Sequence, residues 1–198
     1  MADTSPLGPR RDRRGREVVA GVGRRAFLAM LALIGAGRTL WAQGRQRLRY
    51  RSLTRPVLVP LASLATPGRA RRFVAQGVSP PSAAIPGERM RINGMVARVA
   101  AGDDADCFKA VCVVCPHEQC DVDFVADPGE LDPSVVEEIG EVSDPVYLCP
   151  CHNSTFTMAG GERLGGPAPR GLYLFRVTGV TGTHVEIGEV EEDVLLFF

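Results

Sequence analysis

The chain has 198 residues and no net formal charge, a length that predicts one domain with a hydrophobic core plus extensions. The neutral sum hides an uneven distribution, because thirteen arginines oppose three acids up to Arg55 and the remainder is acidic by the same margin. An apolar segment interrupts the basic stretch and no base-stacking aromatic residues accompany it. These features argue against nucleic acid as a partner.

Residues 1–23 form a basic leader that we expect to lie in the cytoplasm. The segment that follows resembles the core of a twin-arginine export signal, Arg24-Arg25-Ala26-Phe27-Leu28, and it opens an apolar run over residues 26–37. We therefore predict a signal or membrane-anchor helix at residues 24–42. The run is shorter than the roughly 20 residues that span a bilayer. Snorkelling of Arg38 with Trp41 at the interface favours retention, whereas cleavage after Ala42 is the alternative.

The remaining elements predict a small all-β domain at residues 56–198, reached through a basic connector at residues 43–55. An edge strand with prolines is expected at residues 56–61, then a loop at residues 79–87. A hairpin is expected at residues 91–99 with its turn at Asn93-Gly94. Further strands are expected at residues 108–114, 145–148, 172–177 and 184–187. The apolar run at residues 194–198 is expected to pack on this domain or on a partner.

Two short runs carry metal-binding chemistry: Cys115-Pro116-His117-Glu118-Gln119-Cys120 and Cys149-Pro150-Cys151-His152-Asn153-Ser154. Each run offers one thiolate and one imidazole, a set that suits either zinc or a [2Fe–2S] cluster with histidines on one iron. Each run also holds one extra cysteine. Zinc fingers work in reducing compartments and rarely carry a disulfide beside the metal, so one leftover cysteine per loop, which could tie the loops together, favours the cluster.

This arrangement resembles the Rieske iron–sulfur proteins, in particular the disulfide-containing branch of the cytochrome bc and bf complexes. That family's pattern is Cys-x-His-x-x-Cys followed by Cys-x-Cys-His-x-Ser, and both halves are matched here. A third element is similar to the proline loop that covers the family's cluster: Gly165-Gly166-Pro167-Ala168-Pro169. The resemblance extends from Arg91 to the C-terminus and includes the layout of the N-terminus.

The resemblance implies a small antiparallel β domain with one [2Fe–2S] cluster in loops at its tip. It assigns Cys115 and Cys149 to one iron, and His117 and His152 to the other. It also implies a disulfide between Cys120 and Cys151, and a Ser154 hydroxyl that bonds a bridging sulfide. In the family the second-loop histidine meets the quinol, which makes His152 the expected catalytic residue.

The function that the resemblance implies is the Rieske subunit of a quinol-oxidising cytochrome bc-type complex, an electron-transferring oxidoreductase. The expected partners are cytochrome b, a c-type cytochrome, quinol and the bacterial plasma membrane. Because Cys120 and Cys151 need an oxidising compartment, the domain should lie on the outer side. The alternative is the small Rieske subunit of a periplasmic molybdenum oxidoreductase similar to arsenite oxidase.

Several positions depart from the family or need a separate interpretation. Residues 121–144 form an insertion with nine acids and no base. It contains an expected short helix at residues 133–139 with Asp132 as N-cap, and it is either a solvated insertion or a docking surface for a basic partner. Phe156 stands where high-potential members have tyrosine, and Glu118 stands at a position usually apolar. Both should lower the reduction potential. His184 is expected outside the metal site, and Cys107 and Cys112 are expected to be buried free thiols.

Overall fold

A computed structural model describes residues 48–197 of the chain. The predicted leader, the twin-arginine run and the anchor helix at residues 24–42 lie outside the described residues. Within residues 48–197, no helix has the length and apolar character that a membrane span requires.

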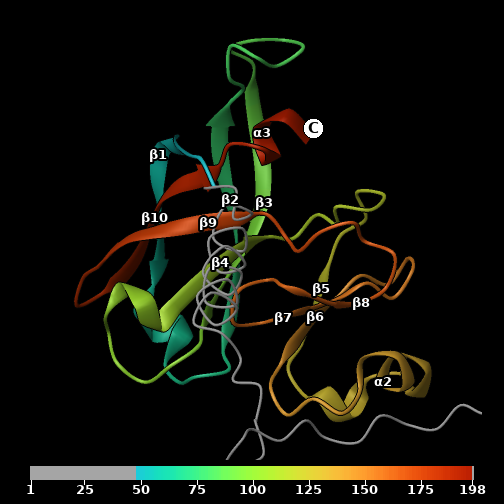
Figure 1. The fold of residues 1–198 in the computed structure, drawn as a ribbon. Coiled ribbons are helices and arrows are strands. Elements are labelled where there is room, and N and C mark those ends of the chain that lie inside the picture. Colours follow the sequence, from blue (N-terminus) through green and yellow to red (C-terminus); the bar gives the residue numbers. More distant parts are fainter. Residues whose placement is uncertain (1–47, 198) are drawn as a thin grey trace, which may run out of the picture. The chain divides into compact units, whose positions relative to one another are not determined.

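The described residues form two antiparallel sheets (Figure 1). The first sheet has six strands, in the order β1 (Tyr50–Pro60), β10 (His184–Glu191), β9 (Leu174–Val180), β4 (Phe108–Cys112), β3 (Arg89–Arg98) and β2 (Ala70–Val78). The second has four strands, in the order β5 (Asp123–Val125), β6 (Val146–Leu148), β7 (Thr155–Thr157) and β8 (Arg163–Gly165). The predicted all-β class is therefore confirmed.

The helices are few and short. Three are single 3-10 turns: η1 (Leu61–Leu64), η2 (Ala105–Cys107) and η3 (Pro128–Glu130). The predicted helix in the acidic insertion is confirmed as α2 (Pro133–Ile139), and the Asp132 side chain accepts the Ser134 N–H as its N-cap. The last element, α3 (Val194–Phe197), buries Val194 and Leu195 in the core of the domain. The described start of the C-terminal apolar run, Val194 and Leu195, thus packs on this domain.

The hairpin predicted with its turn at Asn93-Gly94 is wrong. Strand β3 runs straight through these residues, and its hairpin partner is β2, in a register that sets Phe73 opposite Gly94. The turn lies instead between Val78 and Arg89. A β-carbon on Gly94 would fall 2.3 Å from the ring of Phe73, so the glycine makes room for an aromatic side chain rather than for a turn.

The first strand is also longer than predicted. β1 begins at Tyr50, within the segment expected to be a basic connector, although it lies at one end of the sheet as an edge strand should. The sequence does not predict the first half of β1 because few of its residues are buried. Leu53 is the only buried residue of β1 before Pro56. Arg51 pairs there with Glu192 at 2.9 Å, which offsets some of the charge that suggested a connector.

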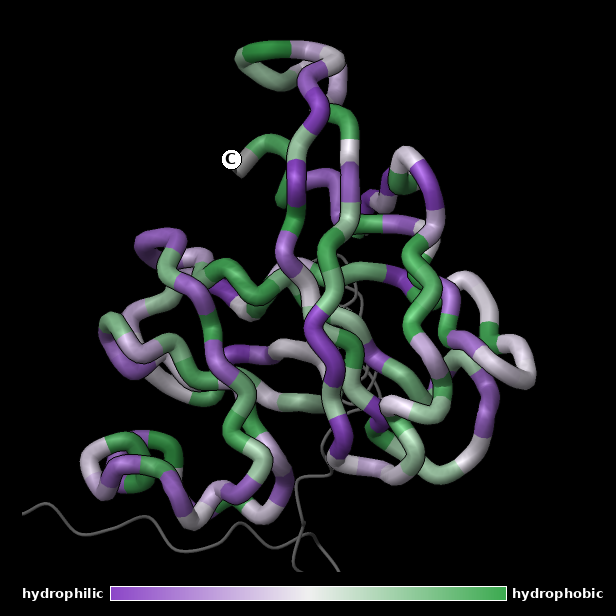
Figure 2. The backbone as a smooth tube through the Cα atoms, turned by 180° about the vertical axis from the view of Figure 1, so that it is seen from behind, coloured by the Kyte–Doolittle hydropathy of each residue, from purple (hydrophilic) through white to green (hydrophobic). Residues whose placement is uncertain are grey.

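The two larger hydrophobic cores serve two purposes. The larger core lies in the six-stranded sheet and includes Phe73, Phe108 and Phe175. The second core joins the sheets, since it combines Val111 and Val113 with side chains from the four-stranded sheet. Figure 2 shows the alternation of hydrophobic and hydrophilic residues along the β2–β3 hairpin that such one-sided burial requires. The second core also contains two of the candidate metal-ligating cysteines, so the metal site is built on it.

Replacing Gly94 tests the close approach of Phe73. We expect Gly94→Ala to cost about 1–3 kcal/mol of stability through overpacking, which lowers the melting temperature by about 2–4 °C per kcal/mol in a chain of this size. Thermal unfolding followed by circular dichroism measures this change. Because Phe73→Leu removes the ring that the new methyl group meets, the double variant should lose less than the sum of the two single changes. Additive losses would contradict the assigned contact.

Candidate metal centre

The two cysteine- and histidine-bearing loops share one backbone turn. The first follows β4 and the second joins β6 to β7. In each loop the N–H of the first cysteine donates to the carbonyl oxygen of the sixth residue (Cys115 to Cys120, 2.9 Å; Cys149 to Ser154, 2.8 Å). The fifth residue is left-handed in both, with φ of 59° at Gln119 and 57° at Asn153. The two loops therefore have the same backbone conformation at equivalent positions.

A disulfide bond between Cys120 and Cys151 joins the loops, with their α-carbons 6.6 Å apart. The pairing expected from the family resemblance is thus present. Among the described residues, the remaining four cysteines are free and buried. Cys107 and Cys112 are confirmed as buried thiols by this arrangement, and Cys115 and Cys149 stay available to a metal.

The two candidate thiol ligands lie inside the second core. Cys115 is fully buried and Cys149 is 2% exposed. Burial raises the pKa of the Cys115 thiol, with a further contribution from its hydrogen bond to Cys149. The two thiols therefore lie together in a space that excludes water. A metal ion stabilises the thiolate form at such a site, because coordination replaces the proton with a cation.

The two candidate imidazole ligands lie on the outside of the same loops. The rings of His117 and His152 meet edge to face with their centroids 5.0 Å apart. Their side chains are 29% and 46% exposed. The Glu118 carboxylate lies beside both rings, 4.0 Å from Nε2 of His117 and 3.8 Å from Nδ1 of His152. The tip of the domain thus combines two imidazoles with one exposed acid.

The donors fit an extended cofactor better than a single ion. Among the described residues, His117 and His152 gather with Glu118 in one group, whereas Cys149 lies beside the disulfide and hydrogen-bonds to Cys115. A tetrahedral zinc ion needs all four donors around one point. A [2Fe–2S] cluster with two thiolates on one iron and two imidazoles on the other needs a buried thiol pair and a separate imidazole pair, and this division is what the loops provide.

The proline-containing loop at residues 165–169 packs against the second ligand loop. Ser154 is fully buried, hydrogen-bonds to the Cys115 sulfur and accepts the Ala168 N–H at 3.1 Å. Gly166 has φ of +82°, and a β-carbon there would fall 2.4 Å from Cα of Ser154. Only glycine therefore permits this approach. The loop closes over the serine that contacts the candidate ligand.

Phe156 lies in the same core and pairs across β6 and β7 with Tyr147. Phe156 is fully buried and has no polar atom to offer the thiols. Tyr147 is also fully buried, its ring lies against Phe124, and its hydroxyl has no hydrogen-bond partner among the described residues. Burial raises the pKa of this hydroxyl above its ordinary value. The sequence does not reveal this residue, because a tyrosine in an apolar strand gives no sign of an unpaired hydroxyl.

A buried ion pair supports the proline loop, and the sequence does not reveal it. Glu191 is 1% exposed and binds the Arg170 guanidinium at 2.5 Å, while its second oxygen accepts the Leu174 N–H at 3.0 Å. Arg170 follows the proline loop directly, so the pair ties the loop's end to strand β10. His184, by contrast, lies at the start of β10 and contacts Thr183, as expected of a residue outside the metal site.

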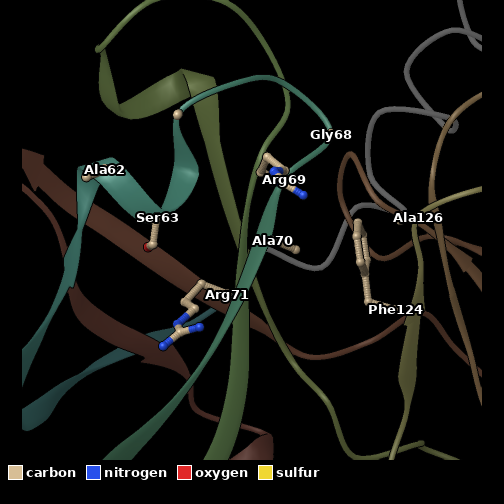
Figure 3. Close-up of a pocket in the computed structure, with 9 residues that line it drawn as sticks. Ala62, Ser63, Gly68, Arg69, Ala70, Arg71, Phe124 and Ala126 are labelled. Carbon is tan, nitrogen blue, oxygen red and sulfur yellow. The ribbon is translucent and has the colours of Figure 1, made fainter.

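A separate cavity of about 460 Å³ lies between the η1–β2 connection and β5. Figure 3 shows Arg69 and Phe124 on its facing walls. Beside it, Arg72 bridges the two sheets by donating to the Val122 carbonyl at 2.8 Å and to Asp123 at 3.1 Å. No residue of either ligand loop lines the cavity, so it is distinct from the metal centre.

One comparison with known proteins agrees with this geometry. The family model for the Rieske [2Fe-2S] domain matches residues 83–177, which include both ligand loops and the proline loop. Among solved structures, the chain is similar to the cyanobacterial plasma membrane Rieske protein PetC3 from Synechocystis PCC 6803. That match is 21% identical, covers 58% of this chain and 84% of that chain, and has a TM-score of 0.31. A search of curated proteins gave no match. The matched domain binds a [2Fe–2S] cluster, which is this chain's cofactor.

Removing the disulfide tests the pairing of the loops. We expect Cys120→Ser and Cys151→Ser each to keep all four candidate ligands but to lose a loop constraint of about 3–4 kcal/mol. The visible absorbance of the cofactor should then decay faster on warming, and its reduction potential should fall. Cys107→Ser is the control, because a serine there can still donate to the Ala101 carbonyl that Cys107 contacts. If the absorbance decay and the reduction potential are unchanged in both disulfide variants, the bond does not stabilise the cofactor site.

Proposed function

Since the match at residues 83–177 identifies this chain as a Rieske iron–sulfur protein, we propose that it is the electron-transfer subunit of a quinol-oxidising cytochrome bc-type complex. In this proposal the chain accepts one electron from quinol beside a cytochrome b partner. It then delivers that electron to a c-type cytochrome. Cys115, Cys149, His117 and His152 would hold the cofactor, and His152 would meet the quinol.

One observation carries the proposal: the imidazoles face outward while the thiols face inward. His152 is 46% exposed at the tip, whereas Cys115 and Cys149 are buried behind it. A hydroquinone carries its reactive hydrogen on a hydroxyl group, so its oxidation needs an acceptor that a substrate can touch. An exposed imidazole nitrogen can accept that hydrogen bond and then hold the proton.

When bound, the cluster supplies a one-electron redox centre whose potential lies in the range of roughly −150 to +300 mV, because neutral histidines replace two anionic thiolates. The chain's own residues set the surroundings of that centre. Ser154 offers a hydroxyl to the Cys115 sulfur, the buried core excludes water from the thiols, and the disulfide holds the histidine-bearing loops together. The exposed Glu118 carboxylate adds negative charge beside both histidines and favours a lower potential within the range.

The proposed location is the outer face of a bacterial plasma membrane. The disulfide supports an oxidising compartment, which cytosolic proteins rarely meet. The twin-arginine run supports export of a domain already folded around its cofactor. Residues 24–42 would serve as the signal or anchor, residues 1–23 would remain in the cytoplasm, and residues 43–49 would lead to β1.

The acidic insertion supports a cationic electron acceptor as the second partner. All nine of its acids are exposed: Asp121, Asp123, Asp127, Glu130, Asp132, Glu137, Glu138, Glu141 and Asp144. Asp123 pairs with Arg72, so most of this charge remains free to attract a basic protein surface. Such complementarity speeds encounter and weakens with ionic strength.

Co-purification from membranes tests the proposed complex. We expect an affinity-tagged chain, extracted in mild detergent, to bring down subunits with b-type and c-type haem spectra and with quinol:cytochrome c reductase activity. An untagged strain carried through the same steps is the control. Recovery of a molybdopterin-containing subunit without cytochrome b would refute the proposal and support the molybdenum oxidoreductase instead.

Substitutions in the second core test how the potential is set. Phe156→Tyr should raise the potential, since a hydroxyl there would donate to a ligand sulfur and stabilise the electron-rich reduced state. Ser154→Ala should lower it by removing a donor. Tyr147→Phe is the matched control on the paired strand, because it removes a hydroxyl that contacts no partner. Redox titration followed by electron paramagnetic resonance gives all the potentials. An unmoved potential in Phe156→Tyr would show that residue 156 does not face the ligand sulfurs.

A further inference from the structure

The acidic insertion is a folded part of the metal centre's support, which corrects its interpretation as a purely solvated segment. Leu131 and Val135 are buried with Val146 of β6 in a small core of their own. Helix α2 lies beside the edge strand β8, which leads directly into the proline loop. A β-carbon on Gly165 would fall 2.6 Å from Cγ2 of Ile139, so the helix lies directly against the start of that loop.

One side chain of α2 reaches the backbone of the proline loop. Oε1 of Glu138 accepts the Gly166 N–H at 2.7 Å, a charge-assisted bond between residues 28 positions apart. The carbonyl oxygen of Gly166 accepts a hydrogen bond from Nη1 of Arg163 at 2.6 Å. Side chains thus bind both the backbone N–H and the backbone carbonyl of Gly166. The left-handed conformation of this glycine lets the loop approach Ser154.

The contacts continue from this glycine to a candidate ligand. Cα of Gly166 lies against Ser154, and two residues later the Ala168 N–H donates to the Ser154 hydroxyl at 3.1 Å. The Ser154 hydroxyl in turn hydrogen-bonds to the Cys115 sulfur. A hydroxyl that accepts one hydrogen bond keeps its single proton to donate, and the Cys115 sulfur is the other partner of Ser154. The position of the proline loop therefore sets how well Ser154 donates to the sulfur.

We propose that Glu138 is a positioning residue for the cofactor. Its carboxylate holds the Gly166 N–H, which keeps the proline loop seated on Ser154 and so keeps the serine donating toward the Cys115 sulfur. The role belongs to the acceptor oxygen rather than to the charge. It holds whichever protein receives the electron, because it depends only on the cofactor and on this chain's contacts.

Three variants separate positioning from electrostatics. Glu138→Ala removes the acceptor and the charge, Glu138→Gln removes the charge but keeps an acceptor oxygen, and Glu137→Ala removes a neighbouring exposed charge from the same helix. Alanine favours helix, so α2 should persist in the alanine variants. If charge alone mattered, all three changes would raise the reduction potential, since each removes a negative charge.

The proposal expects a different pattern in the full-length holoprotein. Glu138→Ala should lower the potential and speed loss of the visible chromophore on warming by about three- to tenfold, as for the loss of one hydrogen bond to a charged group at an exposed position. In Glu138→Gln and Glu137→Ala the reduction potential should not fall, and the visible chromophore should not be lost faster on warming.

A readout independent of redox chemistry is hydrogen exchange at the Gly166 amide. Exchange should accelerate in Glu138→Ala and stay near the parent rate in Glu138→Gln and Glu137→Ala. An equal rise of potential in all three variants would overturn the proposal, as would unchanged Gly166 exchange in Glu138→Ala.

Discussion

The structure of the metal centre depends on one covalent constraint, the bond between Cys120 and Cys151. It connects loops 31 residues apart in sequence, and in the chain-entropy view such a closure is worth about 3–4 kcal/mol. The bond also solves a geometric problem, because the two loops come from different sheets. The first loop is anchored by β4 of the six-stranded sheet, and the second by β6 and β7 of the smaller one. Without a link at their outer ends, small movements between the sheets would separate the ligands.

The shared core supplies the inner half of the same constraint. Val111 and Val113 from one sheet meet Tyr147 and Phe156 from the other, and the thiols of the ligand loops are part of that packing. Interior packing is dense, so buried thiols cannot shift without moving their neighbours. The imidazoles escape this restriction because they lie at the surface. One site thus combines rigid, dry thiols with accessible imidazoles.

The sequence predicted the features that short-range chemistry determines. The spacing of cysteine and histidine located both loops, and Asp132 followed by proline located α2. The resemblance to known proteins identified residues 165–169 as the proline loop. The resemblance to known proteins, rather than the spacing, supplied the disulfide pairing. Features that depend on a distant neighbour were not predictable. Asn93-Gly94 has the composition of a turn, yet Phe73, twenty-one residues earlier, occupies the space above the glycine. Glu138 and Glu191 looked like ordinary surface acids, because their partners follow or precede them by many positions.

The position of α2 in the chain has a consequence for folding. The insertion separates the two ligand loops, and a longer flexible segment would make their meeting slower and entropically more costly. This segment is compact, however, since its capped helix and small core form from residues close to one another in sequence. Local structure of this kind forms early and reduces the volume that the two loops must search. Once this local structure has formed, less flexible chain separates the two ligand loops than the length of the insertion alone would leave between them.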